Sequence, residues 1–125
     1  MKDAIKACDY LWSELVKISG GYKCAMCEQR ATDPHHIITR TRQQFRHHPM
    51  NGVLLCREHH NWAHEHPQEF MTWLSKKRKD QYAWSEQATK QPEPMMFDYE
   101  NIAQDLEKRV VLLQKETMPW VKSRK

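Results

Sequence analysis

The stretch LLCREHHNWAH, residues 54–64, holds four side chains that can bind a metal ion: Cys56, His59, His60 and His64. On an α-helix, His60 and His64 are four residues apart and share a face, so both imidazoles can reach one ion. His59 and His60 are about 100° apart around the same helix, so one ion does not hold both. The stretch therefore predicts two metal sites that divide the adjacent histidines between them.

Two further cysteines complete the first site. Cys24 and Cys27 form a CxxC motif, and Cys56 with His59 repeats that spacing as CxxH. Two such motifs separated by a hairpin-sized segment are typical of a closed tetrahedral zinc site, because soft thiolates suit zinc. The sequence predicts a structural Zn²⁺ bound by these four residues. The fourth cysteine, Cys8, is expected to fill the core from an N-terminal helix.

The second site needs a third ligand, which the adjacent pair His35 and His36 can supply. Neighbours in a strand point to opposite faces, so one of the two histidines can bind the ion while the other approaches the substrate. Three protein ligands with open coordination positions are typical of a catalytic metal rather than a structural one.

Composition and charge indicate one small domain with a polyanionic partner. The chain has 125 residues, 39% of them hydrophobic, so its core should be modest and a structural metal would help to stabilise it. We expect no export signal and no membrane span, because no run approaches about 18 apolar residues. A reducing, cytoplasmic setting follows, in which cysteines bind metals more often than they form disulfides. The net charge of +4, with clustered arginines and lysines, suits nucleic acid.

Apolar spacing predicts a small α+β domain over residues 1–90. An amphipathic helix is expected over 3–19, ended by two glycines. Residues 22–66 should form the zinc knuckle, two short strands near 32–38 and 52–55, and a helix from about 57 to 65.

Helices are also expected to follow this core. Supporting helices are predicted over 67–90, the first of them beginning at Pro67. Two prolines predict a linker over 91–97. A final helix over 98–118, capped by Asp98, precedes a basic tail over 119–125.

These motifs, in this order, resemble the HNH endonucleases, which have the ββα-metal fold. The combination of CxxC, HHI, an asparagine that opens NGVLLC, and CxxHHx3H carries the resemblance, which covers about residues 10–90 and extends weakly to the last helix. Small HNH proteins encoded by phages and prophages are similar in four segments: LWSEL (11–15), TRTRQQFR (39–46), NGVLLCREHH (51–60) and AHEHPQEF (63–70). The resemblance implies a single-metal DNA endonuclease that acts in phage DNA recombination, processing or packaging, in the cytoplasm of a bacterial host.

The resemblance also implies a role for each matching residue. His35, His60 and His64 would hold the catalytic metal. His36 would be the general base that deprotonates the attacking water. Asn51 would hold the loop between the strands and orient His36. An all-histidine site suits Zn²⁺, Ni²⁺ or Mn²⁺, and Mg²⁺ stays possible because it can act through its waters and the substrate's own oxygens.

The segment between the two strands would face nucleic acid. Arg40, Arg42 and Arg46 lie there, and arginine binds phosphate bidentately. Arg46 is the first choice for contacting the scissile phosphate. The basic run 76–79 is expected to follow the DNA backbone or to be a solvated face.

Several of these residues also have a purely structural interpretation. His36 could be a second metal ligand, and Asn51 before Gly52 suits a turn. Asp33 could reach the metal or the groups around it, but because a proline follows, it is interpreted as a turn residue. Four tryptophans are interpreted as core residues: Trp12, Trp62, Trp73 and Trp84.

Two other functions compete with the nuclease. A zinc-stabilised module that binds nucleic acid without catalysis needs only the four zinc ligands and the arginines, but it leaves four histidines unexplained. An assembly protein would use the apolar stripe of the last helix, which is also the surface through which a homodimer rather than a monomer would form.

Overall fold

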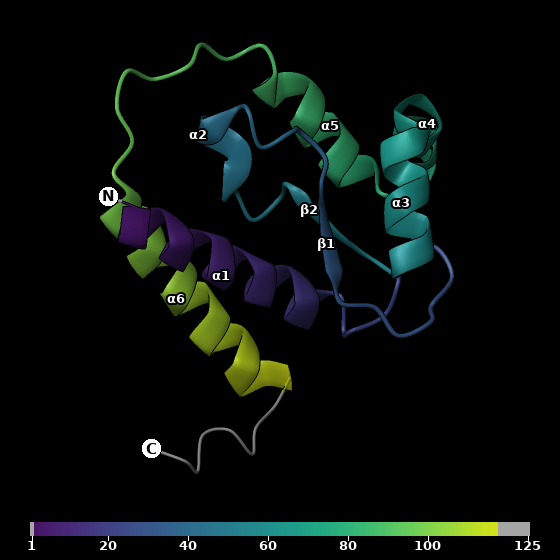
Figure 1. The fold of residues 1–125 in the computed structure, drawn as a ribbon, viewed down its shortest axis with the longest axis horizontal. Helices are drawn as coiled ribbons and strands as arrows, with labels where there is room; N and C mark the ends of the chain where they lie inside the picture. The colour runs from purple at the N-terminus through teal and green to yellow at the C-terminus, as the bar shows by residue number, and fades with distance from the viewer. Residues whose placement is uncertain (1, 118–125) are drawn as a thin grey trace.

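Two short antiparallel strands lie at the centre of the fold, with helices on both sides (Figure 1). The computed structural model describes residues 2–117 of the chain. Strand β1 (Asp33–His36) pairs with β2 (Gly52–Leu55), with His35 opposite Val53 and His36 opposite Gly52. Successive side chains of a strand point to opposite faces. His35 is therefore buried on one face of the hairpin, and His36 lies on the other.

Helix α3 (Arg57–Glu65) begins directly after β2 and packs against both strands. Cys56 caps its first turn, where its sulfur accepts a hydrogen bond from the backbone N–H of His59. Helices α4 (Pro67–Lys77) and α5 (Lys79–Ala88) follow, and Pro67 occupies the first turn of α4, where no hydrogen-bonded N–H is needed. α4 thus packs against α3, and α5 packs against α4 and against the loop between the strands.

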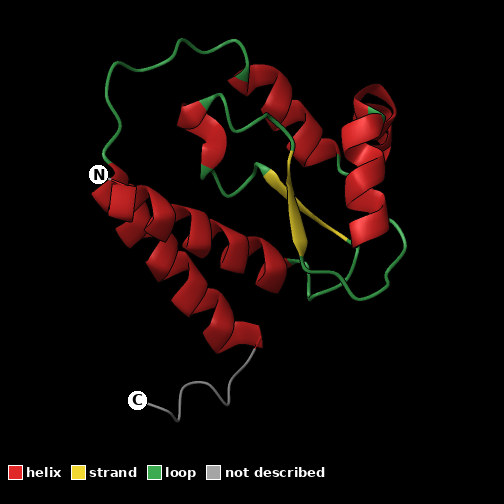
Figure 2. Cartoon of the chain, viewed as in Figure 1, coloured by secondary structure: helices red, strands yellow, loops and turns green. Residues whose placement is uncertain are grey.

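Helices α1 (Lys2–Ser19) and α6 (Tyr99–Thr117) lie side by side across from α3 (Figures 1 and 2). Helical spacing places Cys8, Trp12 and Leu15 of α1 in the core, together with Leu106 and Val110 of α6. The tryptophans thus divide: Trp12 is buried as predicted, whereas Trp62, Trp73 and Trp84 are only partly buried.

Gly52 allows α1 to approach β2 closely. A Cβ atom at this position would lie 2.4 Å from Val16 Cγ2 and 2.9 Å from Trp12 Cζ2. Any other residue would therefore push α1 away from the hairpin.

The loop between the strands contains one element that the sequence did not predict. Helix α2 (Gln43–Arg46) is a single turn whose one buried residue, Phe45, packs with Ile38 and Ala88. One buried aromatic side chain in a polar segment has no periodicity, so no pattern in the sequence indicates this turn.

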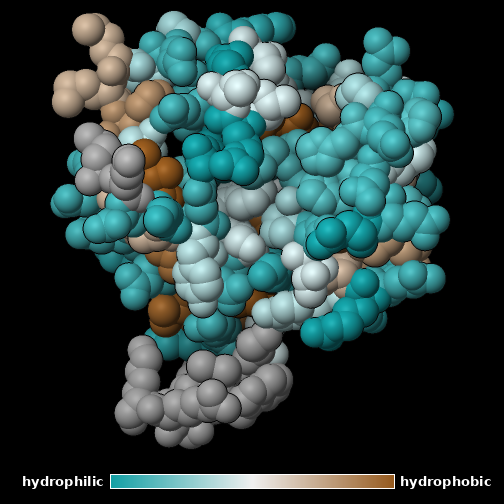
Figure 3. Space-filling model, viewed as in Figure 1, coloured by the Kyte–Doolittle hydropathy of each residue, from teal (hydrophilic) through white to brown (hydrophobic). Residues whose placement is uncertain are grey.

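Residues 91–97, the predicted linker, contain no helix or strand. Asp98 caps α6 by accepting a hydrogen bond from the Asn101 N–H at 3.0 Å. Met118 and the predicted basic tail over 119–125 lie outside the described residues. Within residues 2–117, no helix combines the length and apolar character that crossing a membrane requires. The face seen in Figure 3 is largely hydrophilic, with hydrophobic residues in small patches.

Candidate metal centres and active site

The four predicted zinc ligands converge. Their ligand atoms all lie within 4.8 Å of one another. Cys27 Sγ and Cys56 Sγ are 3.8 Å apart, and Cys24 Sγ lies 3.6 Å from His59 Nδ1. Zinc–sulfur bonds of about 2.3 Å and zinc–nitrogen bonds of about 2.0 Å give tetrahedral edges of about 3.5–3.8 Å. The group is therefore close enough to hold one metal ion and fits a structural zinc.

Local backbone geometry brings these ligands together. Cys24 and Cys27 lie in a tight turn closed by a hydrogen bond from the Glu28 N–H to the Cys24 carbonyl at 2.8 Å. Glu28 adopts a positive φ of 63°, which ends the turn. Cys56 and His59 both belong to the first turn of α3, so their separation is set by helix geometry.

The electrostatics of the three sulfurs also favour a bound cation. Burial raises the pKa of Cys24, but hydrogen bonds from backbone N–H groups outweigh it and bring that pKa to about 7. A backbone hydrogen bond from Gln29 lowers the pKa of Cys27, but burial and the neighbouring sulfurs of Cys24 and Cys56 raise it by more. Three thiolates this close repel one another unless a cation lies between them. Cys8 is separate: it is buried, and its Sγ lies 3.2 Å from the Tyr99 carbonyl.

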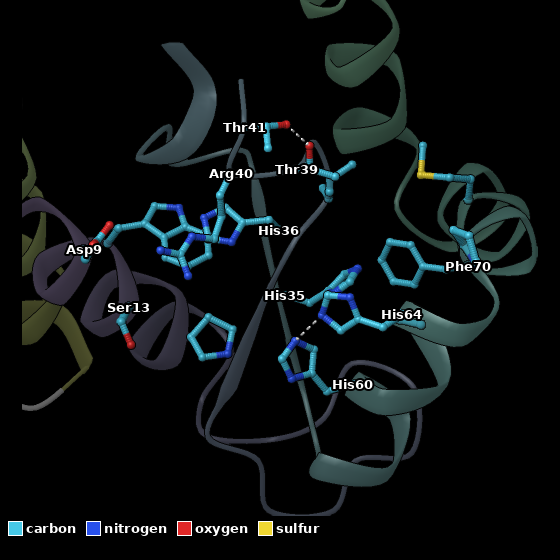
Figure 4. A pocket seen from close by; sticks show the side chains of 16 residues that line it. Asp9, Ser13, His35, His36, Thr39, Arg40, Thr41, His60, His64 and Phe70 are labelled. Carbon is cyan, nitrogen blue, oxygen red and sulfur yellow. Dashed lines mark hydrogen bonds between the residues drawn. The ribbon is translucent and has the colours of Figure 1, made fainter. Parts of the chain in front are cut away.

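A second group of potential ligands forms on the inner face of the hairpin. His35 of β1 meets His60 and His64 of α3, and their ligand nitrogens also lie within 4.8 Å of one another (Figure 4). The Nε2 atoms of His60 and His64 are 3.2 Å apart, as expected for residues one helical turn apart. We call His35, His60 and His64 the histidine triad.

Asp33 fixes the tautomer of one member of the triad. Its Oδ2 atom lies 3.3 Å from His60 Nδ1 and also accepts a hydrogen bond from Arg57 Nε at 2.7 Å. A carboxylate only accepts, so the proton of His60 belongs on Nδ1 and Nε2 keeps its lone pair. The interpretation of Asp33 as a turn residue was wrong, because it is the first residue of β1 and contacts a triad histidine. Asp33 and His60 come together because β1 pairs with β2, the strand that leads into α3.

His35 is the buried member of the triad. Burial, and then the proximity of His60 and His64, lower its pKa to about 3, so its ring is neutral at pH 7. Its Nδ1 atom is buried without a hydrogen-bond partner within the described residues. Neutral imidazole is the metal-binding form of histidine, so His35 is in the protonation state that suits binding of a divalent cation.

His36 lies on the opposite side of β1 from His35, in contact with α1. Its ring stacks on Trp12 with centroids 4.0 Å apart and planes 10° from parallel. Its Nε2 atom lies 2.9 Å from the Arg46 carbonyl oxygen. Because a carbonyl only accepts, Nε2 carries the proton and Nδ1 has the free lone pair. Burial is the main cause that lowers the pKa of His36, to about 4.

Asn51 closes the loop between the strands with three hydrogen bonds. Its Oδ1 accepts from the Ile38 N–H at 2.7 Å, and its Nδ2 donates to the carbonyls of Ile38 and Phe45 at 2.9 Å each. The side chain is fully buried. Asn51 thus holds the loop that carries the Arg46 carbonyl, and it reaches His36 only through that loop.

The three arginines of the loop have different surroundings. Arg40 lines the cleft beside His36, and its charge is one of those that lower the pKa of His36. Arg42 donates to the Gln91 carbonyl and lies over the ring of Phe45. Arg46 makes a two-bond ion pair with Asp9, at 3.0 and 2.7 Å. The phosphate contact expected of Arg46 stays a prediction.

One cleft is lined by the histidine triad, His36 and Arg40. It has a volume of about 740 Å³ and separates α1 from α3 and α4. Its lining includes the histidine triad, His36, Arg40, Thr39 and Phe70 (Figure 4). A potential cation site, a neutral imidazole with a free nitrogen and an arginine therefore face the same space.

Comparison of the chain with protein families, with curated proteins and with solved structures finds no match.

Proposed function

We propose that this chain is a metal-dependent DNA endonuclease of the HNH type, with a ββα-metal core within residues 22–66. The observation that carries the proposal is that the histidine triad and His36 line one cleft. The order β1, β2, α3 is the order of elements that the resemblance to this family implies. A structural zinc at Cys24, Cys27, Cys56 and His59 would stabilise the core next to the cleft.

In this proposal, His36 is the general base. The Arg46 carbonyl holds its proton on Nε2, so Nδ1 is free to accept a proton from a water molecule. The water oxygen then attacks phosphorus, and the bond from phosphorus to the 3′ oxygen breaks. The leaving oxygen takes a proton from solvent, so the products are a 5′-phosphate and a 3′-hydroxyl. The low pKa of His36 keeps its ring unprotonated at neutral pH.

The triad would hold the catalytic cation. A divalent cation bound there would supply positive charge to a phosphate oxygen and to the leaving oxygen. Asp33 keeps the proton of His60 on Nδ1 and thereby leaves Nε2 free to bind. Three imidazoles favour Mn²⁺, Ni²⁺ or Zn²⁺, and Mg²⁺ would act mainly through its waters and the substrate's own oxygens.

Arg40 is our choice for the arginine that contacts the phosphate next to the cleaved bond. Arg40 lines the cleft, and the charge of its guanidinium is one of the causes that lower the pKa of His36. In the same role, Arg46 would have to leave its ion pair with Asp9. Arg42 and the basic run 76–79 would bind the DNA backbone outside the cleft.

A plasmid cleavage assay with Mn²⁺, Mg²⁺, Ni²⁺ or Zn²⁺ tests this proposal. Wild type is expected to convert supercoiled DNA to nicked or linear forms, and His36→Ala is expected to lose this activity while keeping its zinc and its fold. Loss of the base should cost about 10²–10⁴-fold in rate. His66→Ala is the matched control, because His66 belongs to neither metal group and does not line the cleft. Supercoiled DNA that stays intact with every metal would refute the proposal.

A zinc-stabilised module that binds nucleic acid without catalysis is the second candidate. The Cys3His group favours it, because that group is complete without the histidine triad. Counting bound metals separates the two functions. One tightly bound zinc with no second ion, together with DNA binding and no cleavage, would support this alternative.

The expected biological partners also remain proposals. DNA is the proposed substrate, and proteins of phage recombination or packaging in a bacterial host's cytoplasm are the proposed partners, by the family resemblance alone. A homodimer through α6 would bury Leu112, which is 59% exposed in the single chain. Light scattering of wild type and Leu112→Glu distinguishes such a dimer from a monomer.

A further inference from the structure

Contacts from two residues of α1 connect this helix to the surroundings of His36, although α1 lies outside the β1–β2–α3 unit. Trp12 stacks on the His36 ring at 4.0 Å. The indole Nε1 of Trp12 donates to the His48 carbonyl at 3.0 Å. Asp9, one turn earlier on α1, binds both Arg46 and His47. Each contact involves either the ring of His36 or the loop that carries the Arg46 carbonyl, which accepts the Nε2 proton of His36.

Asp9 holds the peptide segment that binds His36. Its Oδ1 accepts from Arg46 Nε at 3.0 Å and from His47 Nε2 at 2.6 Å, and its Oδ2 accepts from Arg46 Nη2 at 2.7 Å. Three hydrogen bonds on two adjacent side chains limit rotation of the backbone between them. The carbonyl of Arg46 leaves this same backbone and accepts the Nε2 proton of His36.

Burial makes this arrangement costly to disrupt. The side chain of His47 is 3% exposed, and that of Arg46 is 17% exposed. Removing the carboxylate would leave a guanidinium partly buried without its partner. The hydrogen bonds of Asp9 to Arg46 and His47 therefore hold the Arg46 carbonyl next to His36.

We propose that α1 positions the general base: Asp9 and Trp12 hold the Arg46 carbonyl and the His36 ring so that His36 keeps its proton on Nε2 and its lone pair on Nδ1. The catalytic role of this positioning rests on the proposed nuclease function. The tautomer of His36 does not, because it can be measured whether or not the protein cuts DNA. Asp9 and Trp12 are positioning residues, since they act through the loop and the ring.

The experiment measures the tautomer and the rate in the full-length, zinc-loaded chain. Long-range ¹H–¹⁵N correlation spectra of ¹⁵N-labelled protein report which ring nitrogen of His36 carries the proton. Asp9→Asn removes the charge from the Arg46 pair, and Trp12→Phe keeps an aromatic ring but removes the indole donor. Glu14→Gln is the matched control, because it also neutralises a carboxylate on α1 but removes only a pair with Lys17. Zinc content and circular dichroism show that each variant is folded.

Wild type is expected to show the proton on Nε2, and both α1 variants are expected to show a mixture of tautomers. For cleavage, kcat should fall about tenfold in Asp9→Asn while KM changes by less than about twofold, because positioning acts on the chemical step. Wild-type ring signals in both variants, or a proton on Nδ1 in wild type, would overturn the inference. If wild type cuts no DNA but Asp9→Asn still alters the His36 signals, the positioning stands and the nuclease proposal fails.

Discussion

At the scale of single residues, two of the three adjacent pairs of histidines are divided by the geometry of the element that carries them. His35 and His36 are strand neighbours, so their rings lie on opposite faces of the hairpin. His59 and His60 are helix neighbours about 100° apart, so one ring meets three cysteines and the other meets the triad. Two adjacent residues therefore contribute to different sites without any change in the backbone.

Asp33→Asn should weaken metal binding at the histidine triad. The carboxylate accepts the Nδ1 proton of His60, and losing such a partner typically lowers metal affinity by about 10–100-fold. Calorimetric titration of the zinc-loaded protein with Mn²⁺ measures the effect. Glu69→Gln is the matched control, because Glu69 pairs with His66, which is outside the triad. Equal Mn²⁺ affinity in Asp33→Asn and wild type would contradict the role of Asp33.

His48 should make stability depend on pH. Burial, and then the charge of Arg109, lower the pKa of His48, and its Nδ1 accepts the Met50 N–H at 3.0 Å. The folded state therefore binds fewer protons than the unfolded state, so stability falls as the pH drops from about 7.5 to about 5.5. Urea unfolding of His48→Asn should lose less stability over this interval than wild type. Parallel losses in the two proteins would contradict this assignment.

At the scale of elements, the turn that carries Cys24 and Cys27 and the first turn of α3 meet at the Cys3His group. A metal ion bound there would join the two segments directly, because each of them supplies two ligands. The same first turn of α3 leads to His60 and His64, one turn apart. The Cys3His group and the histidine triad thus share one short helix, α3.

Cys27→Ser should release zinc and unfold the region around α3. Zinc binding in small zinc peptides is worth about 10–16 kcal/mol apparent, which is comparable with or larger than the net stability of most domains. Zinc content per chain and far-UV circular dichroism, with and without a chelator, measure this loss. Cys8→Ala is the control, since Cys8 is buried on α1 and is expected to keep one zinc per chain. A folded, zinc-loaded Cys27→Ser protein would rule out the predicted ligand set.

At the scale of the whole molecule, the cleft exists because two groups of helices enclose the hairpin. α3 and α4 supply one wall, and α1, supported by α6, supplies the other. Gly52 sets the separation of α1 from the hairpin by leaving space for Val16 and Trp12. The position of α6 therefore affects the site indirectly, through the helix that it supports.

Replacing Leu106 should destabilise the whole fold, whereas replacing Leu112 should not. Leu106 is 1% exposed between α6 and α1, so Leu106→Ala is expected to cost about 2–5 kcal/mol in the free energy of unfolding. Leu112, on the same helix, is 59% exposed, and Leu112→Ala should change stability by less than about 0.5 kcal/mol. Urea denaturation followed by tryptophan fluorescence compares the two variants. Similar losses in both would show that α6 is not packed on α1 in this way.

Much of the fold could be predicted from the sequence, because the residue patterns that indicate its helices and strands are local. The spans of α1 and α6 follow from apolar spacing, and the hairpin follows from two short strand-like segments separated by a basic loop. The single turn of α2 has no such signal, because one buried phenylalanine decides it. The two ligand groups were also predicted, but on different grounds: helix geometry separates His59 from His60 and His64, whereas the family resemblance selected His35 rather than His36.

The sequence by itself determined that His59 separates from His60 and His64, because the spacing of ligands along a helix is a property of the local backbone. Only the tertiary structure decided what surrounds those ligands. Asp33 reaches His60 across the hairpin, Asp9 reaches Arg46 from α1, and Arg40 rather than Arg46 lines the cleft. These contacts join segments distant in the chain, and charged side chains on the surface carry no periodic signal of their partners. Their partners are therefore set by how the helices pack around the hairpin.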